Sequence, residues 1–205
     1  MNDPWLPPTG PRRILLVRHA QSEWNAVGRW QGQADPPLSA FGLEQAAGLN
    51  EHPLLTSFDA IVTSDLQRAR QTADAIDGAA GHPVTIDAGL RELDVGSWSG
   101  RTREAIEADE PGAIARYKAG ETPWTNGETL DQHTARAREV AMRLVSWPDA
   151  EELVAVSHGG TIRILLSLFL GMEDTGRERF AHVHHASVTG LRRAPTGWQL
   201  VSFGV

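Results

Sequence analysis

Short apolar runs alternate with longer amphipathic segments along most of the chain. The apolar runs read as buried strands and lie at residues 14–17, 60–63, 84–86 and 153–156. Two later segments, 187–191 and 198–203, alternate in polarity on either side of a turn at 195–197 and predict a hairpin. Strands that alternate with helices form a mostly parallel sheet with helices on both faces. The pattern therefore predicts an α/β fold.

Helix starts can be read from capping signals between these strands. Ser64 with Gln67, and Thr129 with Gln132, match the capping-box pattern that precedes a helix. Another helix is expected directly after residues 159–160, where two glycines follow a predicted strand. In sheets of this kind, ligands bind beyond the carboxyl ends of the strands. Catalytic and binding residues are therefore expected at those ends.

The composition is that of an ordinary globular protein. The 205 residues suit one domain over 1–205, and we expect residues 1–11, rich in proline, to form a flexible N-terminal tail. No apolar run is long enough to span a membrane and no signal peptide is evident, so a cytoplasmic protein without a membrane partner is expected. The net charge of −7 argues against binding to nucleic acid. The chain has no cysteine, which excludes disulfides, thiolate metal sites and cysteine nucleophiles.

Basic and imidazole side chains follow the predicted strands. Arg18 and His19 come directly after the first strand, and His158 and Gly159 come after the fourth. Arg68 lies in the first turn of a predicted helix, where unpaired backbone N–H groups and the helix dipole favour an anion. These groups, with the two helix N-termini, could hold a phosphate without a metal or another cofactor.

A histidine in such a pocket can attack phosphorus as well as bind the anion. Neutral imidazole is a good nucleophile, and a carbonyl that accepts the other ring N–H would fix the required tautomer. We expect His19 in this role and His158 as a donor to the phosphoryl oxygens. The leaving alkoxide also needs a proton from a carboxylic acid. Glu92 and Asp94 are both candidates, and their spacing does not choose between them.

Five segments, in this order, resemble the histidine phosphatase superfamily in its phosphoglycerate-mutase-like branch. They cover most of the chain: residues 16–25 (LVRHAQSEWN), 31–42 (QGQADPPLSAFG), 64–73 (SDLQRARQTA), the acidic segment around Glu92, and 156–161 (VSHGGT). One departure from the family pattern is Ala20, which stands where the family has glycine after the nucleophilic histidine.

The resemblance implies a fold and a role for each site residue. The fold is a three-layer α/β/α sandwich around a mostly parallel sheet. The implied nucleophile is His19 and the implied proton donor is Glu92. The implied phosphate-binding residues are Arg18, Asn25, Gly32, Arg68, His158 and Gly159, of which Arg18, Arg68 and His158 also belong to the catalytic group.

Other conspicuous residues have simpler interpretations. His182, His184 and His185 lack the carboxylates of a metal site, so we expect surface or core histidines, as for His52, His82 and His133. Trp98 is expected to pack in the core. The sequence leaves open whether Trp24, Trp30 and Trp124 line the mouth of the site. Glu128 resembles a rim motif that orients groups of the site.

Three functions are compatible with these residues. The favoured function is a phosphomonoesterase that hydrolyses small metabolites, such as a sugar phosphate or a phosphoglycerate derivative, through a phosphohistidine intermediate. A cofactor-dependent phosphoglycerate mutase is the second, although residues 111–127 contain only Arg116 and Lys118 to grip a carboxylate. The third is a non-catalytic or protein-phosphate-binding module. We expect specificity to depend on residues 102–126 and 173–185, and the sequence leaves a homodimer open.

Overall fold

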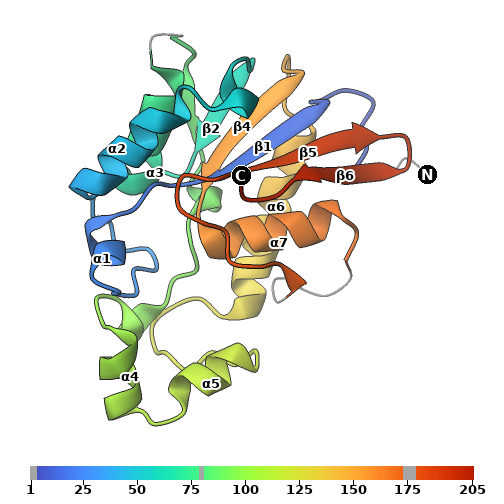
Figure 1. Ribbon diagram of the computed structural model, residues 1–205. Helices are drawn as coiled ribbons and strands as arrows, with labels where there is room; N and C mark the ends of the chain where they lie inside the picture. Colours follow the sequence, from blue (N-terminus) through green and yellow to red (C-terminus); the bar gives the residue numbers. More distant parts are fainter. Residues whose placement is uncertain (1–3, 79–80, 173–178) are drawn as a thin grey trace.

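The computed structural model describes residues 4–78, 81–172 and 179–205. They contain a six-stranded sheet in the order β3-β2-β4-β1-β5-β6 (Figure 1). Its strands are β1 (Arg13–Arg18), β2 (Ala60–Thr63), β3 (Val84–Ile86), β4 (Glu152–Ser157), β5 (Val188–Ala194) and β6 (Gly197–Ser202). The pairs β1–β4, β2–β4 and β2–β3 are parallel, whereas β5 pairs antiparallel with β1 and with β6. The expected mostly parallel sheet and terminal hairpin are confirmed.

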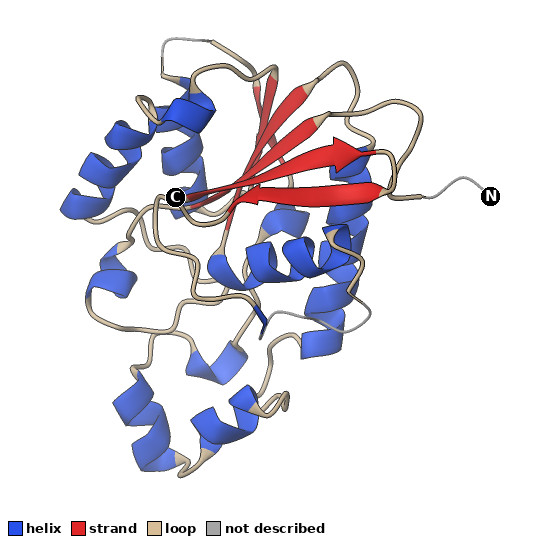
Figure 2. Ribbon diagram, turned by 45° about the vertical axis from the view of Figure 1, so that its right-hand side comes forward, coloured by secondary structure: helices blue, strands red, loops and turns tan. Residues whose placement is uncertain are grey.

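Helices cover both faces of this sheet, which gives the three-layer α/β/α sandwich (Figure 2). On one face, Leu15 and Val17 of β1 pack with α2 (Ala40–Leu49) and α3 (Gln67–Asp77). On the other, Ile14 and Leu16 pack with α6 (Leu130–Val145) and α7 (Gly159–Phe169). Successive side chains of a strand point to opposite faces, so one buried strand serves both cores.

A small lobe lies beyond one end of the sheet, at the bottom of Figure 1. It contains α4 (Arg103–Asp109) and α5 (Ala113–Lys118), and its apolar cluster is separate from the two sheet cores. Trp98 is fully buried in that cluster, as expected. The short elements η1 (Pro53–Leu55), η2 (Ala88–Leu90), η3 (Gly96–Trp98) and α1 (Glu23–Ala26) complete the described structure.

One of the two predicted capping boxes is present. Thr129 and Gln132 make the reciprocal hydrogen bonds at the start of α6. The Ser64–Gln67 box is wrong, because α3 begins at Gln67 itself. Its N-terminus is instead capped from another loop: Asp35 accepts a hydrogen bond from the Gln67 N–H at 2.6 Å. A capping carboxylate that is distant in sequence has no local signature.

The N-terminal segment is packed against the body from Trp5 onward, unlike the flexible tail expected over 1–11. The rings of Trp5 and Phe169 meet edge-on with centroids 6.3 Å apart. The backbone carbonyl of Trp5 accepts a hydrogen bond from Trp198 Nε1 at 2.9 Å. Residues 1–3 lie outside the described part. Among the described residues, no helix has the length and apolar character needed to cross a membrane.

Candidate active site

The site is built where β1 and β4 end side by side. These strands are parallel neighbours, and Arg18 pairs in register with Ser157. His19 and His158 are the next residues of each strand, so their rings come within 5.0 Å of each other. Both rings are almost completely buried, at 3% and 0% exposure. Adjacent parallel strands thus bring together two histidines that are far apart in the sequence.

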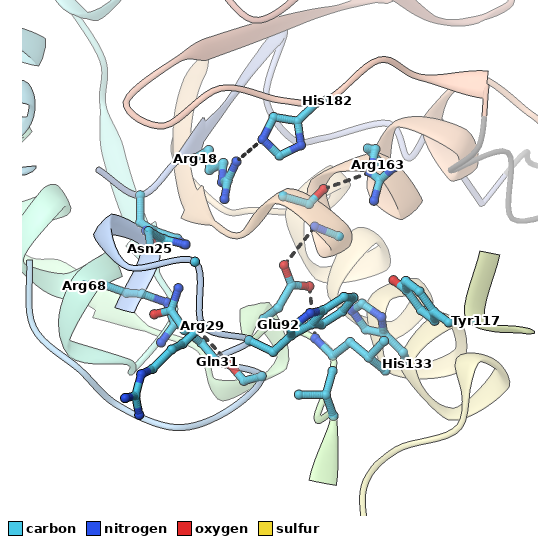
Figure 3. A pocket seen from close by; sticks show the side chains of 18 residues that line it. Arg18, Asn25, Arg29, Gln31, Arg68, Glu92, Tyr117, His133, Arg163 and His182 are labelled. Atoms are coloured by element: carbon cyan, nitrogen blue, oxygen red, sulfur yellow. Dashed lines mark hydrogen bonds between the residues drawn. The ribbon is translucent and has the colours of Figure 1, made fainter. Parts of the chain in front are cut away.

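A cavity of about 410 Å³ opens beside His19 (Figure 3), while His158 packs against His19 and is not among the lining residues. Its size is typical of a small-molecule site. Its lining combines cationic, aromatic and backbone groups: Arg18, His19, Asn25, Gly28, Arg29, Trp30, Gln31, Gly32, Arg68, Glu92, Leu93, Val95, Tyr117, His133, Gly159, Gly160, Arg163 and His182.

The His19 ring is held in one tautomer. Its Nδ1 lies 2.7 Å from the carbonyl oxygen of Ala20, and because a carbonyl only accepts, Nδ1 carries the hydrogen. Nε2 therefore keeps its lone pair. Burial, followed by the charges of Arg68 and Arg18, lowers the His19 pKa well below its usual value. The ring is neutral at pH 7 and can act as a nucleophile.

Ala20 fits the site although the family pattern has glycine there. It is fully buried, its N–H donates to Thr72 Oγ1 at 3.0 Å, and its methyl group belongs to a small cluster with Leu38 and Ala46. The same residue supplies the carbonyl that orients His19.

His158 has the opposite tautomer. Arg68 Nε donates to His158 Nδ1 at 3.3 Å, so in the neutral ring the hydrogen is on Nε2. That nitrogen is buried and has no hydrogen-bond partner among the described residues. Burial, then the charges of Arg68 and His19, lower the His158 pKa well below its usual value. His158 is therefore a neutral donor with an unsatisfied N–H, which favours an oxyanion ligand.

Two buried arginines supply positive charge. Arg68 donates to the carbonyls of Ala34 at 2.7 Å and Gly32 at 2.9 Å. Arg18 donates from Nη1 to the carbonyl of Val183 at 2.6 Å, while its Nε is buried without a partner in the described structure. Burial lowers the pKa of each to about 10, so both stay charged at pH 7.

Two further expected phosphate-binding residues lie on the same wall. Gly32 has φ +53°, and a Cβ there would lie 2.8 Å from Val95, so the turn that offers its carbonyl to Arg68 requires glycine. Asn25 accepts from the backbone of Ser22 at 3.1 Å through Oδ1, which leaves its amide nitrogen for the cavity (Figure 3).

Only one of the two expected helix N-termini faces the cavity. Gly159, the first residue of α7, lines it. The N-terminus of α3 is occupied by the Asp35 carboxylate, so the expectation that it joins the anion site is wrong. Arg68 reaches the cavity through its side chain.

The structure separates the two candidate acids. Glu92 lines the cavity, whereas Asp94 turns back and accepts from the Gly96 N–H at 3.0 Å. Glu92 Oε2 accepts from the N–H of Gly160 at 2.9 Å, and a Cβ on Gly160 would lie 2.4 Å from Glu92 Oε1. Burial raises the Glu92 pKa, but the charge of His133 and the hydrogen bonds from Gly160 and Leu93 outweigh it and lower the pKa. The Glu92 carboxylate is therefore ionised at pH 7.

An ion pair behind Glu92 holds its backbone. Arg136 donates to the carbonyls of Gly89, Arg91 and Glu92 at 2.7–3.1 Å. It also pairs with Glu128 at 2.6 Å, and Glu128 accepts from the Asp94 N–H at 3.0 Å. This agrees with the expectation that Glu128 orients groups of the site.

Sequence reasoning missed several residues of the site. His182 lines the cavity, and its Nε2 accepts from Arg18 at 2.9 Å (Figure 3). His185 packs on His19 with ring centroids 5.7 Å apart. His133, also expected to be an ordinary histidine, lines the cavity beside Glu92. Arg163 also lines the cavity, and it lies four residues after Gly159 and thus on the same face of α7.

Of the three tryptophans whose place the sequence left open, one lines the cavity, and His52 and His82 lie outside it. Trp30 lines the cavity, whereas Trp24 and Trp124 are not part of its lining. His52 caps η1, and His82 pairs with Asp77 at 2.8 Å, as ordinary residues do. No group of three or more potential metal ligands occurs in the described part of the chain.

The fold and the site define the class of protein. The model of the histidine phosphatase superfamily (branch 1) matches residues 14–205, and the chain belongs to this superfamily. A glucosyl-3-phosphoglycerate phosphatase of Mycolicibacterium vanbaalenii is 37% identical over an alignment of 175 residues that covers 78% of this chain and 75% of that protein. A probable phosphoglycerate mutase of Salmonella choleraesuis is 31% identical over 91% of this chain and 87% of its own length.

Solved structures agree with this assignment. A mycobacterial glucosyl-3-phosphoglycerate phosphatase in complex with VO3 superposes with a TM-score of 0.84 at 31% identity, covering 95% of this chain and 99% of its own. The α-ribazole phosphatase of Shigella flexneri superposes with a TM-score of 0.85 at 27% identity, covering 94% and 96%.

Proposed function

We propose that the protein hydrolyses small phosphorylated metabolites through a phosphohistidine intermediate on His19. It is a phosphoric monoester hydrolase of the histidine phosphatase type. The observation that supports this mechanism best is the neutral, tautomer-fixed ring of His19, which lines the cavity with Arg18 and Arg68 and contacts the ring of His158. A mycobacterial relative has been solved with VO3 and with inorganic phosphate, which are oxyanions of the size this site suits.

In the first step, Nε2 of His19 attacks phosphorus in line with the ester oxygen. The N–P bond forms as the P–O bond to the alcohol breaks, and the alkoxide takes its proton from Glu92. Arg18, Arg68 and the Nε2–H of His158 bind the phosphoryl oxygens, assisted by Asn25 and the Gly159 N–H. Donors that are already in position lose little energy to reorganisation when the charge shifts.

In the second step, water replaces the alcohol. The Glu92 carboxylate takes a proton from the water as its oxygen attacks phosphorus. The N–P bond then breaks, which releases inorganic phosphate and restores neutral His19. One carboxyl group thus serves as acid and then as base.

The first step requires protonated Glu92, yet the surroundings of this carboxyl lower its pKa and favour the ionised form. A bound phosphoryl group brings negative charge next to Glu92 and offsets the field of Arg18. Both effects raise the Glu92 pKa. The proton is therefore taken up together with the substrate.

The mutase alternative is less well supported. A mutase must hold a sugar-acid carboxylate, and residues 111–127 were the place to look for paired cations. Arg116 points to Glu110, at 3.6 Å, and neither Arg116 nor Lys118 is among the lining residues. Tyr117 is the residue of this segment that lines the cavity.

The third function is a non-catalytic module. The presence of the nucleophile His19, the acid Glu92 and two buried arginines in the site argues against it. The homodimer and the cytoplasmic location are expectations from the sequence alone.

Phosphate release separates hydrolase from mutase. The purified protein, incubated with a panel of phosphorylated metabolites and no bisphosphoglycerate primer, should release inorganic phosphate in repeated turnovers. His19→Ala should release none. Conversion of 3-phosphoglycerate to 2-phosphoglycerate that depends on the primer, with little free phosphate, would contradict the proposal.

A further inference from the structure

His133 is a buried side chain of the site that the two steps above do not use. It belongs to α6, has 1% exposure and lines the cavity together with Glu92 (Figure 3). Its Nε2 lies 2.8 Å from Oγ1 of Thr161, which is fully buried in the first turn of α7. This contact links two helices that pack on the same face of the sheet.

The hydroxyl of Thr161 reaches the segment that carries the acid. Its Oγ1 lies 2.8 Å from the carbonyl oxygen of Arg91 and 3.5 Å from Oε1 of Glu92. The Arg91 carbonyl also accepts a hydrogen bond from Arg136 of α6 at 2.8 Å, so both helices hold this carbonyl. The place of Glu92 therefore depends on Thr161 as well as on Arg136.

Only one arrangement of hydrogens satisfies these contacts. A threonine hydroxyl has a single hydrogen to donate, whereas the carbonyl of Arg91 and the carboxylate of Glu92 can only accept. The hydrogen of Thr161 therefore points to residues 91–92, and His133 Nε2 is the donor in its contact with Thr161. An Nε2 without a hydrogen would compete with Arg91 for the Thr161 hydrogen. His133 thus sets the direction of the Thr161 hydroxyl.

The orientation of Glu92 matters for the first step. A proton donor must lie within hydrogen-bond reach of the leaving oxygen. A misplacement of about 1 Å at a reacting group can lower the rate about 100-fold. Because Glu92 directly follows Arg91, a shift of the Arg91 carbonyl would move the carboxyl group as well. The bonds through Thr161 are shielded from water, where a hydrogen bond is stronger than at the surface.

We propose that His133 is a positioning residue for the acid step. By donating to Thr161, it directs this hydroxyl to residues 91–92 and keeps the Glu92 carboxyl aimed at the leaving oxygen. His133 itself transfers no proton to the substrate. The proposal rests on the proposed hydrolase function, because it needs Glu92 as the acid.

A pair of variants isolates the hydrogen bond. His133→Gln keeps an N–H donor near the place of Nε2, whereas His133→Leu has none. Both lack the imidazole charge, so this charge cannot cause a difference between them. On an alkyl phosphate, kcat/KM of His133→Leu should be about 10-fold below that of His133→Gln, which is the effect of one net hydrogen bond. On an aryl phosphate, whose leaving group needs little protonation, the two variants should have similar values.

Variants of Thr161 test whether the effect passes through its hydroxyl. Thr161→Val removes the hydroxyl at nearly constant shape and should show the same loss on alkyl phosphates alone. Thr161→Ser, which keeps the hydroxyl, should retain more of this activity. Thr134→Val is the matched control, since the Thr134 hydroxyl donates to the carbonyl of Leu130 within α6 and does not line the cavity. Turnover of aryl phosphate by His133→Leu shows that this variant folds, and Thr161→Val supplies the same comparison if it does not.

The Glu92→Gln background separates an effect on Glu92 from a general effect on the site. If His133 acts through the acid, His133→Leu should cause no further loss on alkyl phosphates once Glu92 is replaced. An additive loss in the double variant, equal losses on both classes of ester, or equal rates for His133→Gln and His133→Leu would overturn the role of His133. Each of these outcomes leaves the hydrolase function standing. No phosphate release by the wild type from any ester would overturn both.

Discussion

Arg68 donates a hydrogen bond from Nε to Nδ1 of His158 at 3.3 Å, and this contact orients both side chains. The bond fixes the His158 tautomer, with the hydrogen on Nε2. At the same time the other nitrogens of Arg68 are held by the carbonyls of Ala34 and Gly32. The guanidinium therefore orients a second donor as well as supplying charge.

Arg68→Lys should lower kcat far more than a conservative substitution usually does. Lysine keeps the charge but cannot make the three directed bonds of the guanidinium. Loss of a preorganised donor of this kind lowers kcat by about 100- to 1,000-fold. Steady-state kinetics on a single ester would measure the loss. Arg70→Lys, on the exposed side of the same helix, is the control and should lie within about twofold of wild type. A mild effect of Arg68→Lys would mean that charge alone suffices.

Glu92→Gln should discriminate between leaving groups. Glutamine cannot supply a proton, and an alkoxide needs one much more than a phenolate does. We expect kcat/KM for alkyl phosphates to fall at least about 100-fold, with aryl phosphates much less affected. Asp94→Asn, which alters the neighbouring carboxyl outside the cavity, should affect neither class. If Glu92→Gln slowed both classes equally, Glu92 would not be the acid of the first step.

The buried histidines predict that the fold loses stability in acid. The pKa values of His19 and His158 are lowered well below 6.5, mainly by burial. The unfolded chain therefore binds more protons below about pH 6.5, and the free energy of unfolding falls as the pH falls. Each such histidine contributes a loss of about 1 kcal/mol at pH 5.5.

Urea unfolding at pH 7.5 and 5.5 measures this loss. In His158→Asn the decrease between the two pH values should be smaller by about 1 kcal/mol. His184→Gln, at an exposed position, should reproduce the wild-type decrease. An unchanged decrease in His158→Asn would show that His158 is protonated in the folded protein.

Much of this site could be predicted because it depends on strand order. His19 and His158 each follow an apolar strand, and parallel strands end at the same edge of a sheet. Arg68 was indicated by its place in the first turn of a predicted helix, and the family motifs supplied Asn25 and Gly32. Choosing Glu92 over Asp94 required coordinates or resemblance, since only the structure shows Asp94 turned back onto Gly96.

Two of the residues that the sequence did not indicate come from the segments expected to determine specificity. His182 comes from the expected specificity segment 173–185, of which 173–178 lie outside the described residues, and Tyr117 comes from the segment 102–126. His182 reaches the site from a loop and Tyr117 from the short helix α5, and neither position has a periodic signature in the sequence. The Asp35 cap of α3 is likewise a contact between distant segments, which local capping patterns cannot indicate.

The most direct test of the account is whether phosphorus becomes bonded to His19 during turnover. The protein should be mixed with a ³²P-labelled ester, quenched in alkali after a few milliseconds and analysed by peptide mass spectrometry. We predict an acid-labile, alkali-stable label on the peptide that contains His19, present in wild type and absent from His19→Ala. Label on another residue, or substrate turnover by His19→Ala at the wild-type rate, would contradict the mechanism.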